Sequence, residues 1–172
     1  MKITAVIAEY NPFHNGHLKQ LRLAKRETEA DILAVVMSGS FTQHGDICVC
    51  DRSTRAQWAM QAGADLVLEL PTVYSLSHAQ RFAEGALKTL SMLGEYTLSF
   101  GTEADELHNL SMAAEFMQSE TKDMSGLLKG YLGQGYSVAK SRTMALGSIR
   151  PDIANMLTSP NNILAVEYIK AS

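Results

Sequence analysis

The sequence has 172 residues, of which 46% are hydrophobic and 19% are charged. These values exclude a disordered or fibrous chain, and the length allows a buried core in one domain, or in one domain with an appendage. With 15 basic and 18 acidic residues, the formal net charge of −3 excludes a generally basic nucleic-acid coat but leaves room for a local basic patch.

The first 37 residues predict a β-α-β unit. Residues 3–8 form a short apolar run rich in β-branched side chains, which predicts a strand, and Glu9-Tyr10-Asn11-Pro12 ends it in a loop. Apolar residues then recur at helical spacing from Gly16 to about Glu29, with basic residues between them. The continuous apolar run over 32–37 is typical of a strand that is buried on both faces, as in a parallel sheet.

The alternation continues to about residue 105. Asp51 can cap a helix that runs to Gly63, residues 65–70 read as a strand before Pro71, and a helix over 77–93 precedes a fourth strand over 96–100. This order predicts an α/β domain with a mainly parallel sheet. Ligands of such domains bind at the carboxyl ends of the strands, which here are followed by the loops 9–17, 38–46, 71–76 and 101–105.

After about residue 105 the pattern is helical throughout. Residues 95–123 hold seven acids against one lysine, whereas residues 124–172 hold five bases against two acids. The basic segment is either a solvated helical face or an edge that meets a polyanion.

Two features predict the cellular compartment. Cys48 and Cys50 are separated by one residue, which suits neither an ordinary disulfide nor a CxxC pair, so we expect reduced thiols. No apolar run approaches the ~20 residues of a membrane span, and the first residues read as a buried strand rather than a secretory signal. We therefore expect a cytoplasmic protein that does not enter a membrane.

The strongest local signal lies between the first strand and the first helix, in Asn11-Pro12-Phe13-His14-Asn15-Gly16-His17. The N-terminus of a helix favours phosphate, two imidazoles three residues apart can face the same phosphate, and Gly16 permits a close approach to the backbone. This pattern suits adenylyl transfer, which needs positioning and charge neutralisation. The alternatives are a metal-binding pair, for which no third ligand is close in sequence, and two structural loop histidines.

Other strand ends and helix starts add weaker candidates. Ser38-Gly39 and Gly101 follow the second and fourth strands, where a glycine turn can approach ribose or phosphate. Arg55 could hold a phosphate or form a surface salt bridge. Asn161 and Asn162 follow Pro160 at a helix start, where an asparagine could cap the helix or read an adenine edge. We predict no metal site, and no P-loop, GxGxxG, GxSxG or HExxH motif is present.

Several longer segments carry a resemblance to a known family: IAEYNPFHNGH, AVVMSGSFTQHGD, DRSTRAQWAMQAGADLVLELP, FAEGALKTLSMLG, LSFGTE and PNNILAVEYIKA. Together they resemble the bacterial tRNA(Met) cytidine acetate ligase family of the HIGH superfamily. The resemblance implies a Rossmann-like, HUP-type nucleotidyltransferase domain over 1–105. It also implies a helical extension over 106–172 that packs on this domain and is truncated relative to the family.

The resemblance also implies an activity. Family members activate acetate with ATP to acetyl-adenylate, release pyrophosphate, and transfer the acetyl group to N4 of the wobble cytidine of elongator tRNA(Met), with Mg²⁺ as the counter-ion of ATP. By similarity His14 and His17 would act at the phosphates, and tRNA would enter over the basic C-terminal part. The expected ATP-binding residues are Ile7, Ala8, Glu9, Tyr10, Asn11, Pro12, Phe13, His14, Asn15, Gly16, His17, Leu18, Lys19, Gln20, Ser38, Gly39, Gly101, Asn161 and Asn162.

The chain departs from the family at three points. His44 and Ala165 stand where relatives usually have Arg and Gly, so a titratable group replaces a permanent cation at a possible phosphate or tRNA contact. Relatives also continue past the position of Ser172 to a Ser/Thr-rich motif with an ATP-site arginine, so we expect a partial ATP site here. A small-molecule adenylyltransferase and a non-catalytic nucleotide- or tRNA-binding module remain alternatives.

Overall fold

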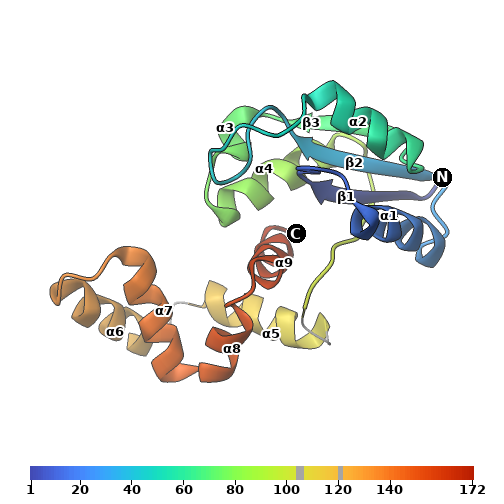
Figure 1. Cartoon of the computed structure of the whole chain (residues 1–172). Helices are drawn as coiled ribbons and strands as arrows, with labels where there is room; N and C mark the ends of the chain where they lie inside the picture. The colour runs from blue at the N-terminus through green and yellow to red at the C-terminus, as the bar shows by residue number, and fades with distance from the viewer. Residues whose placement is uncertain (104–106, 120–121) are drawn as a thin grey trace. The chain divides into compact units, whose positions relative to one another are not determined.

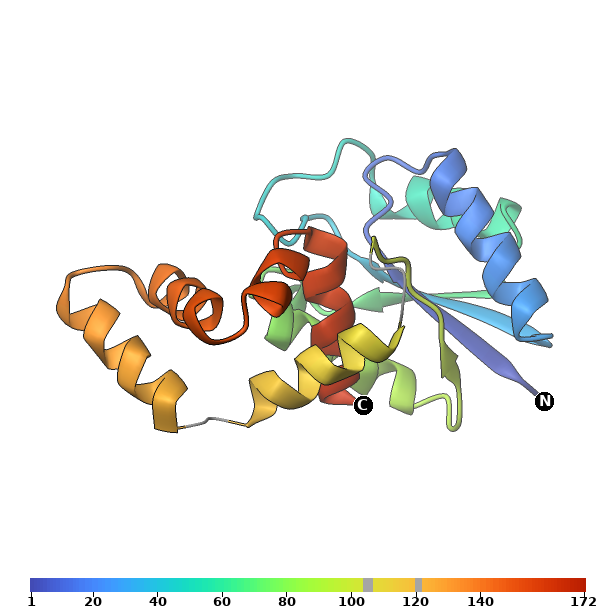
Figure 2. The same cartoon turned by 90° about the horizontal axis from the view of Figure 1, so that it is seen from below.

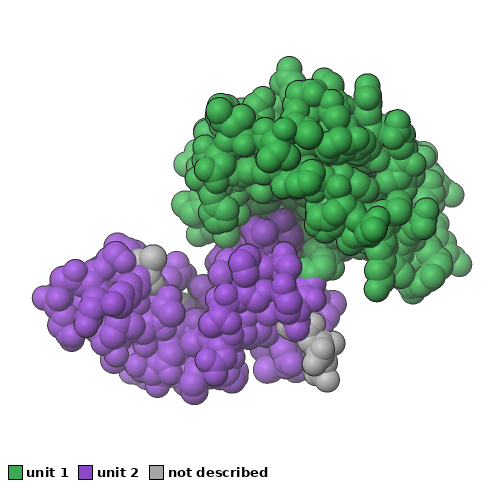
Figure 3. All heavy atoms as spheres, in the orientation of Figure 1, with its two compact units in different colours: residues 1–101, 171 green, residues 102–170, 172 purple. Residues whose placement is uncertain are grey.

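The computed structural model describes residues 1–103, 107–119 and 122–172, and the chain divides into two compact units. Unit 1 comprises residues 1–101 and 171, and unit 2 comprises residues 102–170 and 172 (Figure 3). The boundary that the sequence predicts between 105 and 106 lies outside the described residues. Each unit is therefore considered by itself.

Unit 1 contains a parallel four-stranded sheet with the strand order β3-β2-β1-β4. The strands are β1 (Ile3–Ala8), β2 (Ile32–Ser38), β3 (Leu66–Leu70) and β4 (Thr97–Leu98). β1 and β2 pair over their full common length, from Ile3 opposite Ile32 to Ala8 opposite Met37. β2 is buried at every residue except Ile32, and β1 is buried from Thr4 to Val6 and half-buried at its ends. The parallel sheet that the continuous apolar runs predict is confirmed.

Helices cover both faces of this sheet. α1 (Asn15–Glu27) and α2 (Arg52–Gln61) connect strands that follow one another in the same direction, so right-handed crossovers place both helices on one face. α4 (Ala79–Ser91) connects β3 back to β4 and lies on the other face (Figure 2). Between α1, α2 and the sheet lies a core built around Val6, Leu21, Leu33, Val35 and Ala59.

The ends of α2 confirm the capping signals in the sequence. Asp51 accepts the backbone N–H of Thr54 at 3.0 Å and so caps the first turn. Gly63, just beyond the last turn, has φ +109°, a conformation that side chains with a Cβ rarely adopt.

Two elements differ from the expectation. The predicted loop 71–76 contains the short helix α3 (Thr72–Ser75), which is held by packing: a Cβ on Gly85 of α4 would lie 2.1 Å from the Tyr74 ring. The fourth strand is limited to Thr97–Leu98, because β4 is an edge strand whose described partners are Thr4 and Ala5 of β1. Both outcomes depend on tertiary contacts that a local pattern does not contain.

The regular elements that the structure describes in unit 2 are all helices, as the sequence predicts. It contains α5 (Leu107–Gln118), α6 (Lys122–Gly133), α7 (Val138–Ile149), α8 (Pro151–Met156) and α9 (Pro160–Ala171) (Figure 1). α8 and α9 both begin at a proline, whose missing N–H is not needed at that position. α6 and α7 pack against each other as a helical hairpin. In none of the described segments is a helix both long and apolar enough to cross a membrane.

Candidate active site

His14 and His17 cap the first turn of α1 for each other. His14 is the N-cap residue, and its Nδ1 accepts the backbone N–H of Gly16 at 3.1 Å. In return, His17 Nδ1 accepts the backbone N–H of His14 at 3.2 Å. The two rings stack with their centroids 3.7 Å apart and an angle of 20° between their planes. The loop therefore brings both predicted histidines together at the start of the helix.

This reciprocal cap fixes which nitrogen of each ring carries the proton. A nitrogen that accepts a hydrogen bond has no proton of its own, so each neutral ring has its proton on Nε2. Within the described part of the chain, neither Nε2 has a hydrogen-bond partner. The pair thus presents two N–H donors side by side at the positive end of the α1 dipole. The imidazoles, rather than the backbone N–H groups that they occupy, are the donors offered to a phosphate.

The rings of Tyr10 and Phe13, here called the aromatic bed, pack against His17 and favour its neutral form. The Tyr10 ring meets His17 edge-on at a centroid distance of 4.9 Å, and Phe13 lies against both rings. Burial, and secondarily the nearby His14, lower the pKa of His17 from 6.5 to about 4. His17 is therefore a neutral hydrogen-bond donor at physiological pH rather than a cation.

Two backbone features make this packing possible. Gly16 lies beneath the His14 ring, because a Cβ there would stand 2.9 Å from His14 Cε1. Tyr10 has a positive φ of 52°, which turns the chain after β1 and places the side chain inside the unit. The Tyr10 hydroxyl is buried and has no hydrogen-bond partner among the residues that the structure describes, and burial raises its pKa.

Arg55 joins the loops at the ends of β1 and β2. Its side chain is fully buried, and its guanidinium donates to the backbone carbonyls of Glu9 (2.6 Å), Ser38 (3.1 Å), Cys50 (3.1 Å) and Gly39. The surface salt bridge considered for Arg55 is therefore wrong. The phosphate contact stays a prediction, and a phosphate would have to replace carbonyl oxygens that already satisfy the guanidinium.

A hairpin over residues 41–47 lies next to the histidine loop. Its two sides pair at Phe41 and Ile47, and the exposed His44 precedes Gly45 at the turn. The backbone N–H of Gln43 donates to the Glu9 carboxylate at 2.6 Å, which ties this hairpin to the end of β1. The hairpin that carries His44 is thus tied to the end of β1, and a contact of His44 with phosphate or tRNA stays a prediction.

A second hydrogen bond ties the loop after β1 to the chain just beyond the 41–47 hairpin. Asn11 Oδ1 accepts the backbone N–H of Val49 at 2.7 Å. Cys48 and Cys50, which flank Val49, are free thiols, as expected. The remaining members of the predicted 7–20 segment lie at the end of β1 (Ile7, Ala8), in the loop (Pro12) and in the first turns of α1 (Asn15, Leu18, Lys19, Gln20).

The two glycine-bearing strand ends differ in what surrounds them. A Cβ on Gly39 would lie 2.5 Å from Glu69 Oε1, so Glu69, which pairs with Arg52 at 2.8 Å, already explains this glycine. Ser38 before it is fully buried. Gly101 follows β4 at the edge where β1 also ends, and a Cβ there would meet no atom within 4 Å. Nucleotide contacts at these positions remain predictions.

Asn161 and Asn162 belong to unit 2 and are held there by Glu103. The Asn161 amide donates to Glu103 Oε1 at 2.7 Å, and Asn162 Oδ1 accepts the backbone N–H of Glu103 at 3.0 Å. Ser159 is the N-cap of α9 and also donates to Glu103, so the interpretation of the asparagines as helix caps is wrong. The hydrogen bonds from Ser159, which contributes most, and from Asn161 lower the pKa of the Glu103 carboxyl. Their role as nucleotide ligands stays a prediction.

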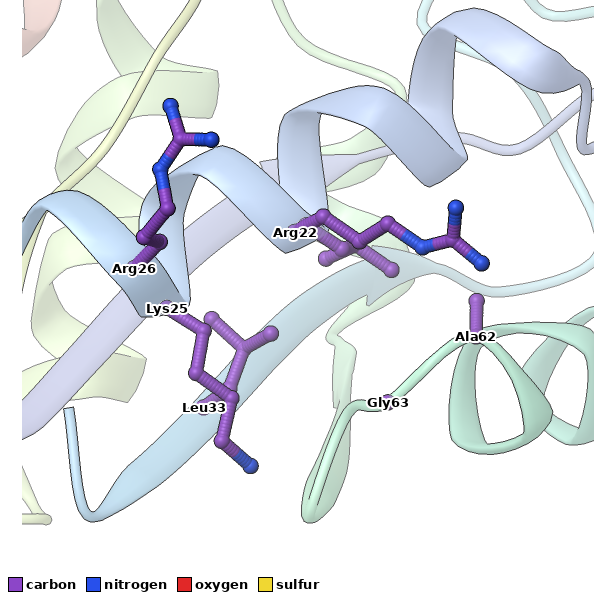
Figure 4. A pocket seen from close by; sticks show the side chains of 7 residues that line it. Arg22, Lys25, Arg26, Leu33, Ala62 and Gly63 are labelled. Atoms are coloured by element: carbon purple, nitrogen blue, oxygen red, sulfur yellow. The ribbon is translucent and has the colours of Figure 1, made fainter. Parts of the chain in front are cut away.

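A hollow of about 340 Å³ in unit 1 lies at the other end of α1. Arg22, Lys25 and Arg26 line it together with Leu21, Leu33, Ala62 and Gly63, and Arg22 reaches toward Ala62 while Arg26 points away (Figure 4). At 1.5 Å per residue, Lys25 is roughly 16 Å along the helix from His14. Lys25 and Arg26 lie in the last turn, where cations complement the helix dipole. This hollow is therefore separate from the histidine pair.

The sequence profile of the HIGH Nucleotidyl Transferase family matches residues 1–172. The chain belongs to this family. The features that this chain brings to the family are its parallel sheet and the paired histidines where β1 leads into α1.

Curated relatives in the family carry a more specific name. The tRNA(Met) cytidine acetate ligase of Clostridium acetobutylicum is 41% identical over 99% of this chain and 45% of its own length. The protein of the same name from a Thermoanaerobacter species is 44% identical over 99% of this chain and 43% of its own. The chain thus spans less than half the length of these curated relatives.

A solved structure agrees with the fold throughout the chain. The crystal structure of Thermotoga maritima TmcAL bound with α-thio ATP superposes with a TM-score of 0.89 at 37% identity. The match covers 99% of this chain and 43% of the Thermotoga maritima chain. The fold is therefore that of a HIGH nucleotidyltransferase, and a neighbour with this fold binds an ATP analogue.

Sequence reasoning missed the structural part of the site. It identified the histidines but not the aromatic rings beneath them, and it considered a phosphate contact or a surface salt bridge for Arg55 but not its hydrogen bonds to buried backbone carbonyls. One signal was available for Arg55: it lies one helical turn before the apolar Ala59, and these two residues form the buried face of α2.

Proposed function

We propose that this chain takes part in the ATP-dependent activation of acetate to acetyl-adenylate and in acetyl transfer to N4 of the wobble cytidine of elongator tRNA(Met). The observation that carries the proposal is the pair of parallel imidazoles whose Nε2–H donors have no partner among the described residues. The names of the relatives, and the ATP analogue bound to Thermotoga maritima TmcAL, support it.

In the proposed reaction a carboxylate oxygen of acetate attacks the α-phosphorus of ATP, and the bond to the bridging oxygen of pyrophosphate breaks. Negative charge accumulates on the non-bridging oxygens as this occurs. His14 and His17 donate hydrogen bonds to these oxygens from a rigid position, so no reorganisation is needed in the transition state. The N4 amine of cytidine then attacks the acetyl carbon, the bond from that carbon to the phosphate oxygen breaks so that AMP leaves, and the amine loses one proton to solvent.

The neutrality of His17 suits this role. A neutral imidazole stabilises the developing charge by donating its Nε2 proton without transferring it, and the lowered pKa of about 4 keeps that state populated. Mg²⁺ would neutralise the β- and γ-phosphates when ATP binds. Mg²⁺ commonly binds through the phosphates of its substrate, so it would enter together with the nucleotide.

The experiment measures pyrophosphate release from ATP and Mg²⁺, with and without acetate and with and without tRNA. We expect acetate-dependent release that needs no tRNA, because tRNA enters only in the second step. His17→Ala should lower the rate about 100- to 1,000-fold, the typical effect of losing a transition-state donor. His17→Gln, which keeps both an acceptor and a donor, should recover part of it.

His78→Ala is the matched control, because His78 is an exposed N-cap of α4 that makes no side-chain capping bond. Thermal unfolding of each variant separates lost chemistry from lost folding. ATP binding without acetate-dependent release would instead favour the non-catalytic module, and release that requires a phosphorylated acceptor would favour a small-molecule adenylyltransferase. Full activity of His17→Ala would refute the role given to the pair.

The partners follow from the same proposal. Acetate and elongator tRNA(Met) would be the substrates that accompany ATP, and the cytoplasm would be the compartment in which they meet.

A further inference from the structure

Arg55 is a buried cation without a counter-ion. Its side chain is the largest of the fully buried side chains that the structure describes. Among the described residues no carboxylate forms an ion pair with it, and its guanidinium is surrounded instead by the carbonyl oxygens of Glu9, Ser38, Gly39 and Cys50. Carbonyl oxygens solvate a cation without cancelling its charge, and an arginine stays protonated in proteins. A full positive charge therefore lies inside unit 1.

This charge lies at the edge of the sheet where α/β domains bind their ligands. Its partners Glu9 and Ser38 stand where β1 and β2 end. Glu9 precedes Tyr10, whose ring meets His17 at a centroid distance of 4.9 Å, so the guanidinium is on the order of 10 Å from the histidine pair. That is about one Debye length at 0.1 M salt, and a buried charge is screened less than an exposed one. The field of Arg55 therefore reaches the histidine pair.

The exposed charges near Arg55 do not cancel this field. Arg52 and Glu69 neutralise each other in an exposed ion pair at 2.8 Å. Asp51 is exposed as well, and its carboxylate accepts the backbone N–H of Thr54 at the N-terminus of α2, where the helix dipole offsets a negative charge. Solvent screens all three of these charges more strongly than it screens the buried guanidinium.

The half-buried carboxylate of Glu9 opposes Arg55 more directly. The Cys48 thiol lies close enough to both groups to report their balance. Burial raises the pKa of this thiol, and the Arg55 charge acts against that rise more strongly than the Glu9 carboxylate adds to it. The net potential beside the segment after β2 is therefore positive.

We propose that the positive charge of Arg55 strengthens the binding of the nucleotide's phosphates through space, from beneath the site and without touching them. Arg55 is thus a positioning residue for the polyphosphate. It holds the ends of β1 and β2 together and supplies a fixed charge that does not reorganise when the ligand binds. The position of the phosphates beside the histidine pair rests on the proposed function.

Isothermal titration calorimetry tests this role with ATP, inorganic tripolyphosphate and adenosine as ligands. Arg55→Gln removes the charge, whereas Arg55→Lys keeps it, and both variants lose the forked guanidinium. We expect Arg55→Gln to weaken the binding of ATP and tripolyphosphate at least about tenfold, the effect of one charge at roughly 10 Å and an effective dielectric constant near 20. Arg55→Lys should weaken both less than about threefold. Adenosine, which has no charge, should bind equally to both variants.

A role for Arg55 in folding alone predicts another pattern, in which Arg55→Gln and Arg55→Lys lose affinity equally for all three ligands. That pattern would overturn the proposal, and so would a lack of tripolyphosphate binding by the unaltered chain. Arg52→Gln is the matched control, because it removes an exposed cation from the same helix. We expect it to change the affinity less than about twofold. Thermal unfolding without ligand identifies the temperatures at which each variant is folded.

Glu9→Gln tests the same balance of charge if the variants of Arg55 do not fold. A glutamine keeps a side-chain oxygen for the backbone N–H of Gln43, so the hydrogen bond between these residues can remain. Removal of the negative charge that opposes Arg55 should strengthen tripolyphosphate binding about threefold. An affinity that does not rise would contradict the proposal.

Acetate-dependent pyrophosphate release separates this proposal from the proposed function. If the unaltered chain releases no pyrophosphate but tripolyphosphate binding follows the charge of residue 55, the role of Arg55 stands and the proposed chemistry fails. If release occurs while Arg55→Gln and Arg55→Lys bind tripolyphosphate equally, the chemistry stands and the role of Arg55 fails.

Discussion

The histidine pair of unit 1 and the asparagine pair of unit 2 were both expected to contact the nucleotide, yet their hydrogen bonding differs. The histidines use their Nδ1 atoms within the loop and keep an Nε2–H donor each. The asparagines are engaged by Glu103, and Asn162 also donates to the carbonyl of Met156. A ligand can therefore add bonds at the first pair, whereas it must exchange existing bonds at Asn162 and at the amide nitrogen of Asn161.

This contrast shows that two side chains can both hydrogen-bond within the protein and still differ in the atoms that they leave for a ligand. A ring with two nitrogens can satisfy the backbone with one atom and address a ligand with the other. An amide whose oxygen and nitrogen both have protein partners stabilises the fold first. We therefore expect substitutions at the histidine pair to affect activity more strongly than substitutions at the asparagine pair.

The largest expected effect concerns Arg55, here called the clamp because its hydrogen bonds hold together the loops that follow β1 and β2. Arg55→Met should lower the free energy of unfolding by about 3–5 kcal/mol, because buried carbonyls of four residues lose their donor. Urea unfolding followed by circular dichroism measures this. Arg52→Met is the control, since its exposed ion pair with Glu69 contributes less than about 1 kcal/mol. Equal losses in the two variants would show that Arg55 is not a clamp.

A smaller effect is expected from the titration of His17. Its pKa is about 4 in the folded chain and 6.5 when unfolded, so between these values the unfolded state binds more protons. The free energy of unfolding should therefore fall as the pH drops from about 6.5 to about 4 and should receive no further loss from this group below that. Because the ring is half-exposed, we expect this loss to be on the order of 1 kcal/mol.

The measurement compares unfolding curves of the protein and of His17→Gln at several pH values. The difference between the two should carry the dependence on pH, since the carboxylates titrate equally in both. A difference that does not vary with pH would contradict the aromatic bed as the cause of the lowered pKa.

The smallest expected effect is at the second pair. Asn161→Ala should weaken ATP binding less than about fivefold, because a contact between ATP and the Asn161 amide nitrogen would replace the bond from that nitrogen to Glu103. Isothermal titration calorimetry measures the affinity, and Asn155→Ala on the neighbouring α8 is the control. A loss as large as that of His17→Ala would remove the contrast between the pairs.

Much of unit 1 could be predicted from the sequence, because its strands are continuous apolar runs and its helix ends carry Asp51 and Gly63. The helix α3 could not, since packing of Tyr74 on Gly85 holds it. For the site, the spacing of His14 and His17 predicted that they meet, but not which nitrogen faces outward. That depends on backbone N–H groups whose positions are set by the loop.

Because His14 and His17 cap the first turn of α1 for each other, the position of their two Nε2–H donors depends on whether that turn is folded. Fraying of the first turn of α1 would release both rings at once, although the sheet and the clamp would stay intact. The amide of Gly16, which donates to His14, would then exchange its hydrogen with solvent at the rate at which the donor pair comes apart. Slowing of that exchange by ATP would report how firmly a nucleotide holds the pair together.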